Sequence, residues 1–338
     1  MQMKAVVCEK PGEIGLVDRP VPEAGDGEVL LKVQRVGLCG TDFHIYGGKH
    51  PFLEYPRIMG HELSGEVASV PAGSQFKVGD PVIVNPYLPC QSCVACRQGK
   101  PNCCVNVSVL GVHDHGGMCE YLAVPELALY PARNLTPNQG AMVEFLSIGA
   151  HAVSRGRVTA GQRVLVVGVG PIGLGAALIA RLEGADVTVL DGNASRIEKA
   201  KSEFGFSQAV FLSEKTQEEL SAFTDGEFYD VVFDATGNAK AIEAGFGLVA
   251  HGGTYVLVSV VKDTISFADP EFHKREMSLV GSRNATREDF EYVISKIESG
   301  DLPTDKLHTH SCALTELPQQ LPEWSANPDE VIKAIAKI

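Results

Sequence analysis

Four closely spaced cysteines form the most specific chemical pattern in this sequence. They are separated by two, two and seven residues and are Cys90, Cys93, Cys96 and Cys104. Four thiolates at such spacing can surround one tetrahedral zinc ion on a single loop, and a complete set leaves no coordination position open. We therefore expect a structural zinc site that stabilises the fold, rather than a set of free thiols.

A second group of metal-binding residue types lies earlier in the chain. Cys39 is followed at a distance by the adjacent pair His61 and Glu62. A thiolate, an imidazole and a carboxylate, with one position left for water, can form a catalytic zinc site. From the residue types alone, two other interpretations stay open: Cys39 as a buried structural residue, and His61 and Glu62 as a surface pair.

A glycine-rich motif follows the apolar stretch at residues 163–167. Its residues are Gly168, Val169, Gly170, Pro171, Ile172 and Gly173. The first glycine permits a tight turn, the second lets a pyrophosphate approach the backbone, and the third lets a helix pack closely on the strand. The helix N-terminus then faces the phosphate charge. The motif predicts a dinucleotide site, and the alternative is a strand–helix turn without a ligand.

An acidic residue ends the next predicted strand. Asp191 stands where the ribose hydroxyls of a dinucleotide would be held. Its charge would repel a 2′-phosphate, so we expect NAD rather than NADP as the cofactor. Arg196 could attract that phosphate; we interpret it as a solvated helix residue beside the cofactor. Both residues belong to the predicted cofactor-binding set.

The elements around this motif alternate regularly. The predicted strands are 163–167, 186–190, 209–212, 230–234 and 253–258, and the predicted helices lie near 172–183, 195–204, 238–249 and, later, 287–298. Such alternation predicts an α/β fold with a doubly wound parallel sheet covered on both faces. The first 85 residues instead carry short apolar runs between turns, which is typical of a β-barrel or sandwich. Residues 86–106 form an excursion loop that needs something to order it.

The composition limits the class of protein. A chain of 338 residues favours two domains. A net charge of -13 without a basic block argues against nucleic-acid binding. No long apolar span and no targeting segment are visible, so we expect no membrane partner and a cytoplasmic location. In that compartment cysteines bind metal more often than they form disulfides.

Taken in order, the motifs resemble those of the zinc-containing medium-chain alcohol dehydrogenases. The shared pattern is Cys39-Gly40-Thr41-Asp42-x-His44, Gly60-His61-Glu62-x2-Gly65, Gly79-Asp80-x-Val82, the four-cysteine loop and Gly168-x-Gly170-x2-Gly173. The resemblance runs from Lys4 to Ile335. It implies a GroES-like β-barrel catalytic domain formed by residues 1–147 and 284–338, and a Rossmann NAD-binding domain at 148–283. It also implies two zinc ions per chain and NAD as cofactors.

The same resemblance implies roles for several residues. Cys39 and His61 would be ligands of the catalytic zinc. Glu144 matches the glutamate that polyol dehydrogenases present to the metal, although Phe145 stands where the family usually has proline. Glu62 is the competing third ligand, and the two carboxylates could exchange during turnover.

The resemblance also implies a path for the proton of the alcohol. Thr41 and His44 match the family's relay, which passes the proton from the threonine hydroxyl through a ribose to an imidazole. Histidine suits the final transfer to solvent because it titrates near neutral pH. The alternative for His44 is an ordinary surface histidine.

A narrower resemblance concerns the substrate. The segments 55–62, 111–117, 269–276 and 281–286 are similar to those of sugar-acid dehydrogenases in this family, among them L-galactonate and L-gulonate 5-dehydrogenases. This implies oxidation of a secondary alcohol at C5 of a hexonate to a keto acid. Arg283 is the first candidate to bind the substrate carboxylate, and the alternative is an ion pair at the domain junction. His113 either lines the pocket or holds its own loop.

Other functions stay open. Within enzymes, the alternatives are a neutral polyol dehydrogenase and an L-threonine dehydrogenase. A non-catalytic protein that binds NAD and zinc is a more distant alternative, which the complete donor and relay sets argue against. We expect a homo-oligomer, either a dimer or a tetramer.

Overall fold

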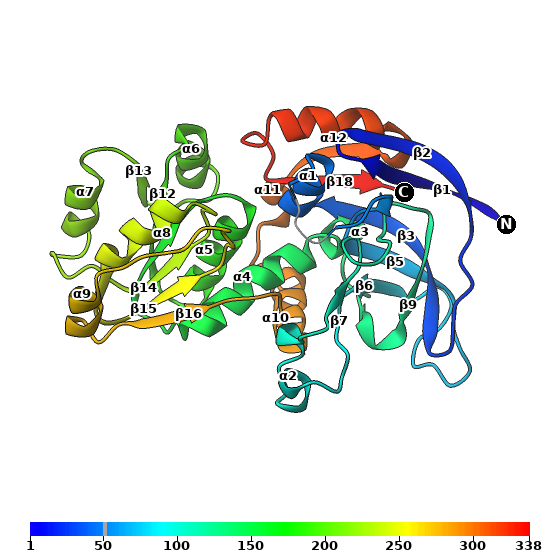
Figure 1. The fold of residues 1–338 in the computed structure, drawn as a ribbon, viewed down its shortest axis with the longest axis horizontal. Coiled ribbons are helices and arrows are strands. Elements are labelled where there is room, and N and C mark those ends of the chain that lie inside the picture. The colour runs from blue at the N-terminus through cyan, green and yellow to red at the C-terminus, as the bar shows by residue number, and fades with distance from the viewer. Residues whose placement is uncertain (50–52) are drawn as a thin grey trace. The chain divides into compact units, whose positions relative to one another are not determined.

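The computed structural model describes residues 1–49 and 53–338 and divides them into two compact units (Figure 1). Unit 1 contains Met1–Glu144 and Thr286–Ile338, so it is built from two separate stretches of the chain. Unit 2 contains Phe145–Ala285. No helix in the described part of the chain is long and apolar enough to cross a membrane.

Unit 1 is mainly antiparallel β-structure. Its strands are β1 (Gln2–Lys10), β2 (Glu13–Pro20), β3 (Glu28–Leu38), β4 (Arg57–Ile58), β5 (Glu62–Ser69), β6 (Pro81–Val84), β7 (Tyr87–Leu88), β8 (Ser108–Val109), β9 (Tyr121–Pro125), β10 (Leu129–Pro131), β17 (His308–Ala313) and β18 (Lys333–Lys337). The largest sheet has the order β10-β6-β5-β3-β18-β17, and β9 pairs with β3. The β texture predicted from the first 85 residues is confirmed.

The register of three neighbouring strands positions the chemistry of unit 1. In the antiparallel pair of β3 and β5, Gly37 lies opposite Glu62. In the antiparallel pair of β18 and β3, Ile335 lies opposite the same glycine. The C-terminal strand therefore lies two strands away from Glu62, in one sheet (Figure 1).

Short helices complete unit 1. They are α1 (Gly40–Tyr46), α2 (Val94–Arg97), α3 (Pro137–Gly140), α10 (Arg287–Glu298), α11 (Thr304–Leu307) and α12 (Leu317–Ala326), with 3₁₀ turns at Pro101–Cys103, Glu126–Ala128 and Leu314–Glu316. The core combines residues from both stretches of the chain, such as Val36, Leu63 and Trp324. The tail after residue 286 is therefore part of this core.

Unit 2 contains a six-stranded sheet in which every pairing is parallel. Its strands are β11 (Arg163–Val167), β12 (Asp186–Asp191), β13 (Gln208–Phe211), β14 (Tyr229–Asp234), β15 (Val249–Leu257) and β16 (Ser278–Gly281). The order β13-β12-β11-β14-β15-β16 is that of a doubly wound dinucleotide-binding sheet. The predicted parallel sheet is confirmed, and β16 adds a sixth strand that the apolar pattern did not indicate.

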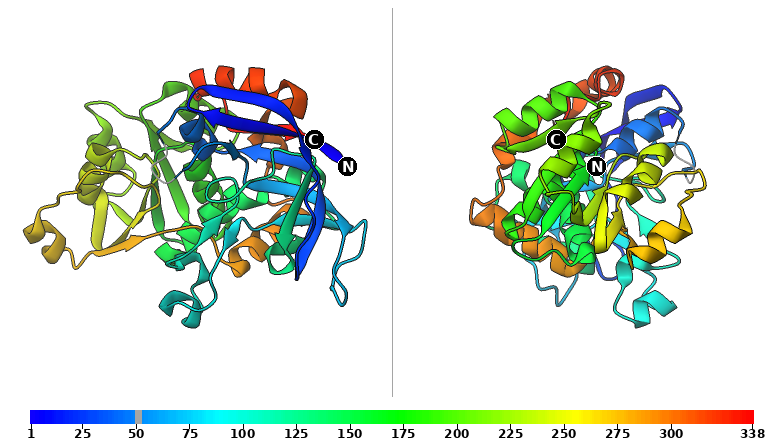
Figure 2. Two further views of the ribbon diagram at one scale, coloured as in Figure 1. Left: turned by 45° about the vertical axis from the view of Figure 1, so that its right-hand side comes forward. Right: turned by 90° about the vertical axis from the view of Figure 1, so that its left-hand side faces the viewer.

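Helices lie on both faces of this sheet (Figure 2). They are α5 (Pro171–Leu182), α6 (Ala194–Ser202), α7 (Thr216–Ala222), α8 (Ala239–Gly245) and α9 (Asp269–Lys274), with a 3₁₀ turn at Phe246–Leu248; α4 (Val143–Gly156) precedes the sheet. α5 follows the glycine-rich turn directly, as predicted. All its residues from Gly173 to Ala180 are buried, so this part of the helix is enclosed on every side, and its small residues let it lie close to the strands.

Candidate metal centres and cofactor site

Cys39, His61 and Glu62, here named the mixed donor group, lie together in unit 1. Their ligand atoms are all within 4.8 Å of one another. Cys39 follows β3 and caps α1, while His61 precedes β5 and Glu62 is its first residue. His61 is 5% exposed and Glu62 is fully buried. Because β3 and β5 are neighbouring strands, Cys39 lies beside His61 and Glu62 although they are far apart in the sequence.

A buried aspartate holds the two segments of this group in place. One carboxylate oxygen of Asp42 accepts the backbone N–H of Cys39 at 2.9 Å, and the other accepts that of Gly60 at 3.1 Å. Asp42 is fully buried. Sequence reasoning gave this residue no role, although its place between Cys39 and His44 was a usable signal.

The surroundings of His61 suit a cation. Burial alone would lower the pKa of this histidine, but a hydrogen bond to Cys39 and the charges of Cys39, Asp42 and Glu144 raise it well above its ordinary value. Its Nδ1 is buried without a hydrogen-bond partner in the described residues. A thiolate, an imidazole and carboxylates are the donors that zinc prefers. The residues therefore fit a zinc ion.

Glu144 lies nearby on the first turn of α4. It is buried and accepts a hydrogen bond from the hydroxyl of Tyr87, a residue that sequence reasoning missed. Burial raises the pKa of Glu144, and the charge of Glu62 adds to this, while His61 and Tyr87 act in the opposite direction. Among the described residues, the cluster of ligand atoms within 4.8 Å includes Glu62 and does not include Glu144.

Lys333 is a third residue that sequence reasoning missed, after Asp42 and Tyr87. Its ammonium lies 2.6 Å from both carboxylate oxygens of Glu62 and donates to the Leu38 carbonyl at 3.1 Å. The side chains of Lys333 and Glu62 are 1% and 0% exposed, so the ion pair is fully buried. The signal was a lysine directly before the apolar residues of the C-terminal strand.

The two residues of the expected proton relay lie on α1. The Thr41 hydroxyl is 3.8 Å from the Cys39 sulfur. His44 is exposed and lies in the last turn of the same helix. Residues three apart on a helix lie on neighbouring positions of one face, so α1 extends from the metal group to the protein surface.

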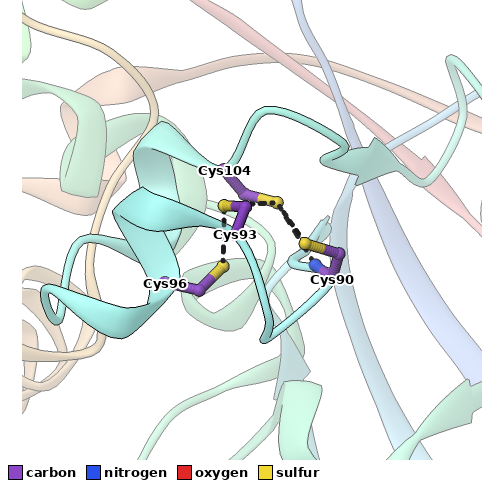
Figure 3. A group of neighbouring side chains, drawn as sticks. All are labelled: Cys90, Cys93, Cys96 and Cys104. Atoms are coloured by element: carbon purple, nitrogen blue, oxygen red, sulfur yellow. Dashed lines mark hydrogen bonds between the residues drawn. The ribbon is translucent and has the colours of Figure 1, made fainter.

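The four cysteines of the excursion loop, here named the tetracysteine group, also converge. Their sulfurs face one another around a common centre (Figure 3). The Sγ–Sγ distances are 3.4 Å for Cys90–Cys104, 3.5 Å for Cys93–Cys96 and 3.8 Å for Cys93–Cys104. Tetrahedral zinc with Zn–S bonds of about 2.3 Å spaces its sulfurs by about 3.8 Å, so this group fits one zinc ion.

Backbone amides support the thiolates of the tetracysteine group. The N–H groups of Cys90 and Asn106 donate to the Cys104 sulfur at 3.2 and 3.4 Å. Hydrogen bonds from Ser92 lower the pKa of Cys90 to about 5. Cys103 is exposed and lies outside the group. Burial raises the pKa of Cys96 to about 12, so the hydrogen bonds within the loop favour the thiolate at Cys90 and not at every member of the group.

In unit 2, the glycine-rich turn lines a cavity of about 770 Å³ together with Asp191 and Arg196. Gly168 has a φ of 89°, which favours glycine. A Cβ on Gly173 would lie 1.8 Å from the Gly168 carbonyl oxygen, whereas one on Gly170 would meet nothing closer than 3.8 Å. Gly168 therefore permits the turn, Gly173 lets the helix pack closely, and Gly170 leaves one face open, as the motif predicts.

Asp191 and Arg196 lie side by side at this cavity. The Asp191 carboxylate accepts the N–H groups of Val169 at 2.6 Å and Asn193 at 2.7 Å. A guanidinium nitrogen of Arg196 is 3.7 Å from the same carboxylate. The predicted Pro171 and Ile172 form the first turn of α5.

The two expected substrate residues are both exposed. His113 accepts the backbone N–H of Val109 at its Nδ1, at 3.0 Å, which is the loop-holding arrangement. Arg283 lies in unit 2, shortly after β16.

Comparison with known proteins places both units in described families. Residues 25–134 match the alcohol dehydrogenase GroES-like domain, and residues 171–299 match the zinc-binding dehydrogenase family. The expected combination of a GroES-like domain with a Rossmann sheet is confirmed.

Individual relatives cover nearly the whole chain. It is 41% identical to L-galactonate-5-dehydrogenase of Escherichia coli (strain K12) over 334 residues, 98% of each chain. It is 33% identical to D-altritol 5-dehydrogenase of Agrobacterium fabrum over 340 residues, 97% of each chain. A crystal structure of the alcohol dehydrogenase rspB from E. coli CFT073, complexed with NADH, matches with a TM-score of 0.93 and 30% identity over 100% of this chain and 99% of that chain. By these matches the chain belongs to the zinc-binding medium-chain alcohol dehydrogenases, which makes it a zinc-dependent NAD(P) dehydrogenase.

Proposed function

We propose that this enzyme oxidises a secondary alcohol of a sugar acid, at C5 of a hexonate such as L-galactonate or L-gulonate, and reduces NAD. The observation that carries the chemistry is the convergence of Cys39, His61 and Glu62 in a buried site. The substrate class rests on the similarity to L-galactonate-5-dehydrogenase over 98% of the chain. The reaction removes a hydride from the carbinol carbon and a proton from its hydroxyl, which leaves a ketone.

The mixed donor group and Glu144 would hold the catalytic zinc. A bound zinc ion supplies a Lewis acid that makes an alcohol hydroxyl more acidic. The protein has to accept the released proton. Thr41 stands beside Cys39 to receive it, and His44 is exposed and can pass it to water. The tetracysteine group would hold the second, structural zinc.

The cavity of unit 2 would bind the dinucleotide. The face left open by Gly170 suits a pyrophosphate, and the Asp191 carboxylate suits ribose hydroxyls. Arg196 lies beside Asp191 and could attract the 2′-phosphate of NADP. The preference for NAD therefore depends on the negative charge of Asp191, which would repel that phosphate. We expect Asp191→Ser to narrow the difference in kcat/KM between NAD and NADP. A wild-type enzyme with the higher kcat/KM for NADP would contradict the assignment.

Arg283 is our proposed partner of the substrate carboxylate. Hydride transfer needs a second anchor several carbons from the reacting hydroxyl. A charge-assisted contact contributes about 1.5–3 kcal/mol, or roughly tenfold to a hundredfold in kcat/KM. Arg283→Ala should cause that loss with an aldonate and much less with the matching neutral polyol. Arg283→Lys is the matched control, because it keeps the charge without the planar fork.

A neutral polyol is the second candidate substrate. The observation in its favour is the 33% identity to D-altritol 5-dehydrogenase over 97% of the chain. NADH formation measured side by side with hexonates and hexitols decides between the two. Higher kcat/KM for a hexitol would remove the sugar-acid assignment. If Arg283→Ala lowers kcat/KM equally for both substrates, Arg283 has a structural role.

We also propose that the enzyme is a homo-oligomer. β16 is at the end of its sheet and pairs only with β15 among the described strands, and its Leu279 is exposed. An uncovered edge strand offers backbone groups for pairing with a second chain. Light scattering during gel filtration tests this, and a monomeric mass at micromolar concentration would contradict it.

A further inference from the structure

A second cavity lies within unit 1 and has a volume of about 670 Å³. Its lining comes mainly from the end of β2 and the segment after it, from β9, and from the loop between β8 and β9. None of its described lining residues belongs to the mixed donor group, the tetracysteine group or the cofactor cavity. The proposed function therefore gives no role to this cavity, here named the β2–β9 cavity.

Two nitrogen atoms at the β2–β9 cavity lie close together, and both carry hydrogen. The Nδ1 of His115 accepts the backbone N–H of Ile58 at 3.2 Å, so the hydrogen of the neutral ring is on Nε2. This Nε2 lies 3.5 Å from a guanidinium nitrogen of Arg19, and a guanidinium group has donors only. Two donors cannot hydrogen-bond to each other, but at this separation both can donate to one oxygen atom.

The electrostatic surroundings of His115 favour a negatively charged acceptor. Burial lowers the pKa of His115, and the positive charges of Arg19 and Arg57 lower it further, while Asp114 acts in the opposite direction. The ring is therefore neutral at pH 7 and lies in the field of two guanidinium groups. The Nε of Arg57 is buried and has no hydrogen-bond partner among the described residues. An anion beside Arg19 and His115 would be attracted by both arginines.

Acidic residues at the same cavity limit the charge of a ligand. Asp114, Glu23 and Glu28 also line it. Asp114 accepts a hydrogen bond from the Ser108 hydroxyl, and Glu28 accepts the backbone N–H of Gly25 at 2.8 Å. These carboxylates would repel a second negative charge on the ligand. A singly charged carboxylate is therefore favoured over a phosphate dianion.

Much of the remaining lining is apolar. Met3, Leu110 and Leu122 are buried, whereas His115 is exposed and Arg19 is half-buried. A ligand with a carboxylate at one end can keep that group partly hydrated and place an apolar chain against the buried side chains, which is favourable. The cavity thus suits a molecule with one charged end and one apolar end.

We propose that unit 1 binds an organic monocarboxylate with an apolar chain in the β2–β9 cavity, where Arg19 and His115 hold its carboxylate. This site goes beyond the proposed function and depends neither on zinc nor on which alcohol the enzyme oxidises. It is also separate from the proposed substrate anchor, because Arg283 lies in unit 2.

The test uses hexanoate as the probe, with hexan-1-ol and inorganic phosphate as comparison ligands. Binding to the purified, zinc-loaded full chain is measured by ligand-observed NMR titration. Arg19→Met removes the charge, and Arg19→Lys keeps it. Arg133→Met is the matched control, because the side chain of Arg133 is 73% exposed and does not line the cavity. Every titration is repeated in Cys39→Ser, since a carboxylate or an alcohol can also bind to a catalytic zinc.

If the proposal holds, hexanoate binds at one such site per chain, and Arg19→Met raises its Kd by roughly tenfold to a hundredfold, the scale of a charge-assisted hydrogen bond. Arg19→Lys should raise it less, and Arg133→Met should match the wild type. The same Kd values should be found in the Cys39→Ser background. Hexan-1-ol lacks the charge and phosphate lacks the apolar chain, so both should bind at least about tenfold more weakly.

Several results would overturn the proposal. Equal Kd values for the wild type and Arg19→Met would remove the role of Arg19, and loss of hexanoate binding in Cys39→Ser would place the ligand at the catalytic metal. Phosphate that binds as tightly as hexanoate would exclude the ligand class. If Arg19→Met is unstable, Ala123→Leu decides, because it narrows the same cavity and should weaken hexanoate binding.

The proposed function and this site can fail independently. None of these titrations measures turnover, so failure of the sugar-acid assignment leaves the test intact. Failure of the test in turn leaves the substrate assignment intact.

Discussion

The tetracysteine group and the mixed donor group differ in how the chain assembles them. The first takes all its ligands from one loop, between Cys90 and Cys104, and backbone amides of that loop donate to its sulfurs. The second draws on segments that meet only after β3 and β5 have paired, and it lies among buried charges. A metal site that only stabilises the fold can take all its ligands from one loop. A site with an open coordination position needs ligands that the surrounding fold holds in place.

Cys39→Ser should distinguish the roles of the two metal groups most clearly. Loss of this proposed ligand should remove the contribution of the catalytic metal, which lowers kcat/KM on the order of a thousandfold or more, since metal stabilisation amounts to several kcal/mol. The protein should stay folded and retain one zinc per chain. Metal analysis, NADH formation and circular dichroism check this. Two retained zinc ions with near-normal activity would break the distinction.

Asp42→Ala should show that the mixed donor group depends on its surroundings. The change leaves the amides of Cys39 and Gly60 without their acceptor, and each buried unpaired donor costs about 1–3 kcal/mol. We expect a clear loss of stability in urea unfolding, together with weaker retention of the catalytic zinc only. Asp42→Asn, which keeps an acceptor oxygen, is the control. Equal stability of the alanine and asparagine variants would argue against this bracing role.

Cys104→Ser should act on stability before activity. Cys104 is the buried member of the tetracysteine group. Loss of a structural metal belongs to the mechanisms with large effects, and we expect about 2 kcal/mol, or roughly 4–8 °C in Tm for a domain of this size. Limited proteolysis should then cut within residues 86–106. Full resistance of this loop to protease, with one zinc lost, would show that the metal does not order it.

Cys103→Ser should have the smallest effect. The residue is adjacent to Cys104 but exposed and outside the group, so stability should change by less than about 0.5 kcal/mol. Zinc content should stay at two per chain. A loss of zinc in this variant would mean that the ligand set of the loop includes Cys103.

The features that the sequence predicts best are those with local causes. The turn from Gly168 to Gly173 and the strands around it follow from residue types within a short window, and they form where expected. The spacing of the four cysteines likewise predicts their convergence, because a short loop limits where their sulfurs can lie.

The remaining features depend on long-range pairing. β16 consists of four residues with mostly exposed side chains, so it shows no apolar pattern; its place follows from parallel pairing with β15. Tyr87 and Lys333 carry no motif either. Their importance appears only when a distant strand or helix brings Glu144 and Glu62 beside them. Composition could indicate the metal chemistry but not the partners of each carboxylate.

The ion pair also constrains the order in which the protein folds. Glu62 and Lys333 are 271 positions apart, and the whole of unit 2 is inserted between the two stretches of unit 1. Contacts of such long range form late, because a large loop has to close first. Unit 2 is continuous, so its sheet can form while unit 1 is still open. Cys39 and His61, the proposed zinc ligands, are synthesised long before Lys333. A zinc ion captured during synthesis would therefore meet Glu62 before its cationic partner, and the C-terminal strand would be the last part of the site to arrive.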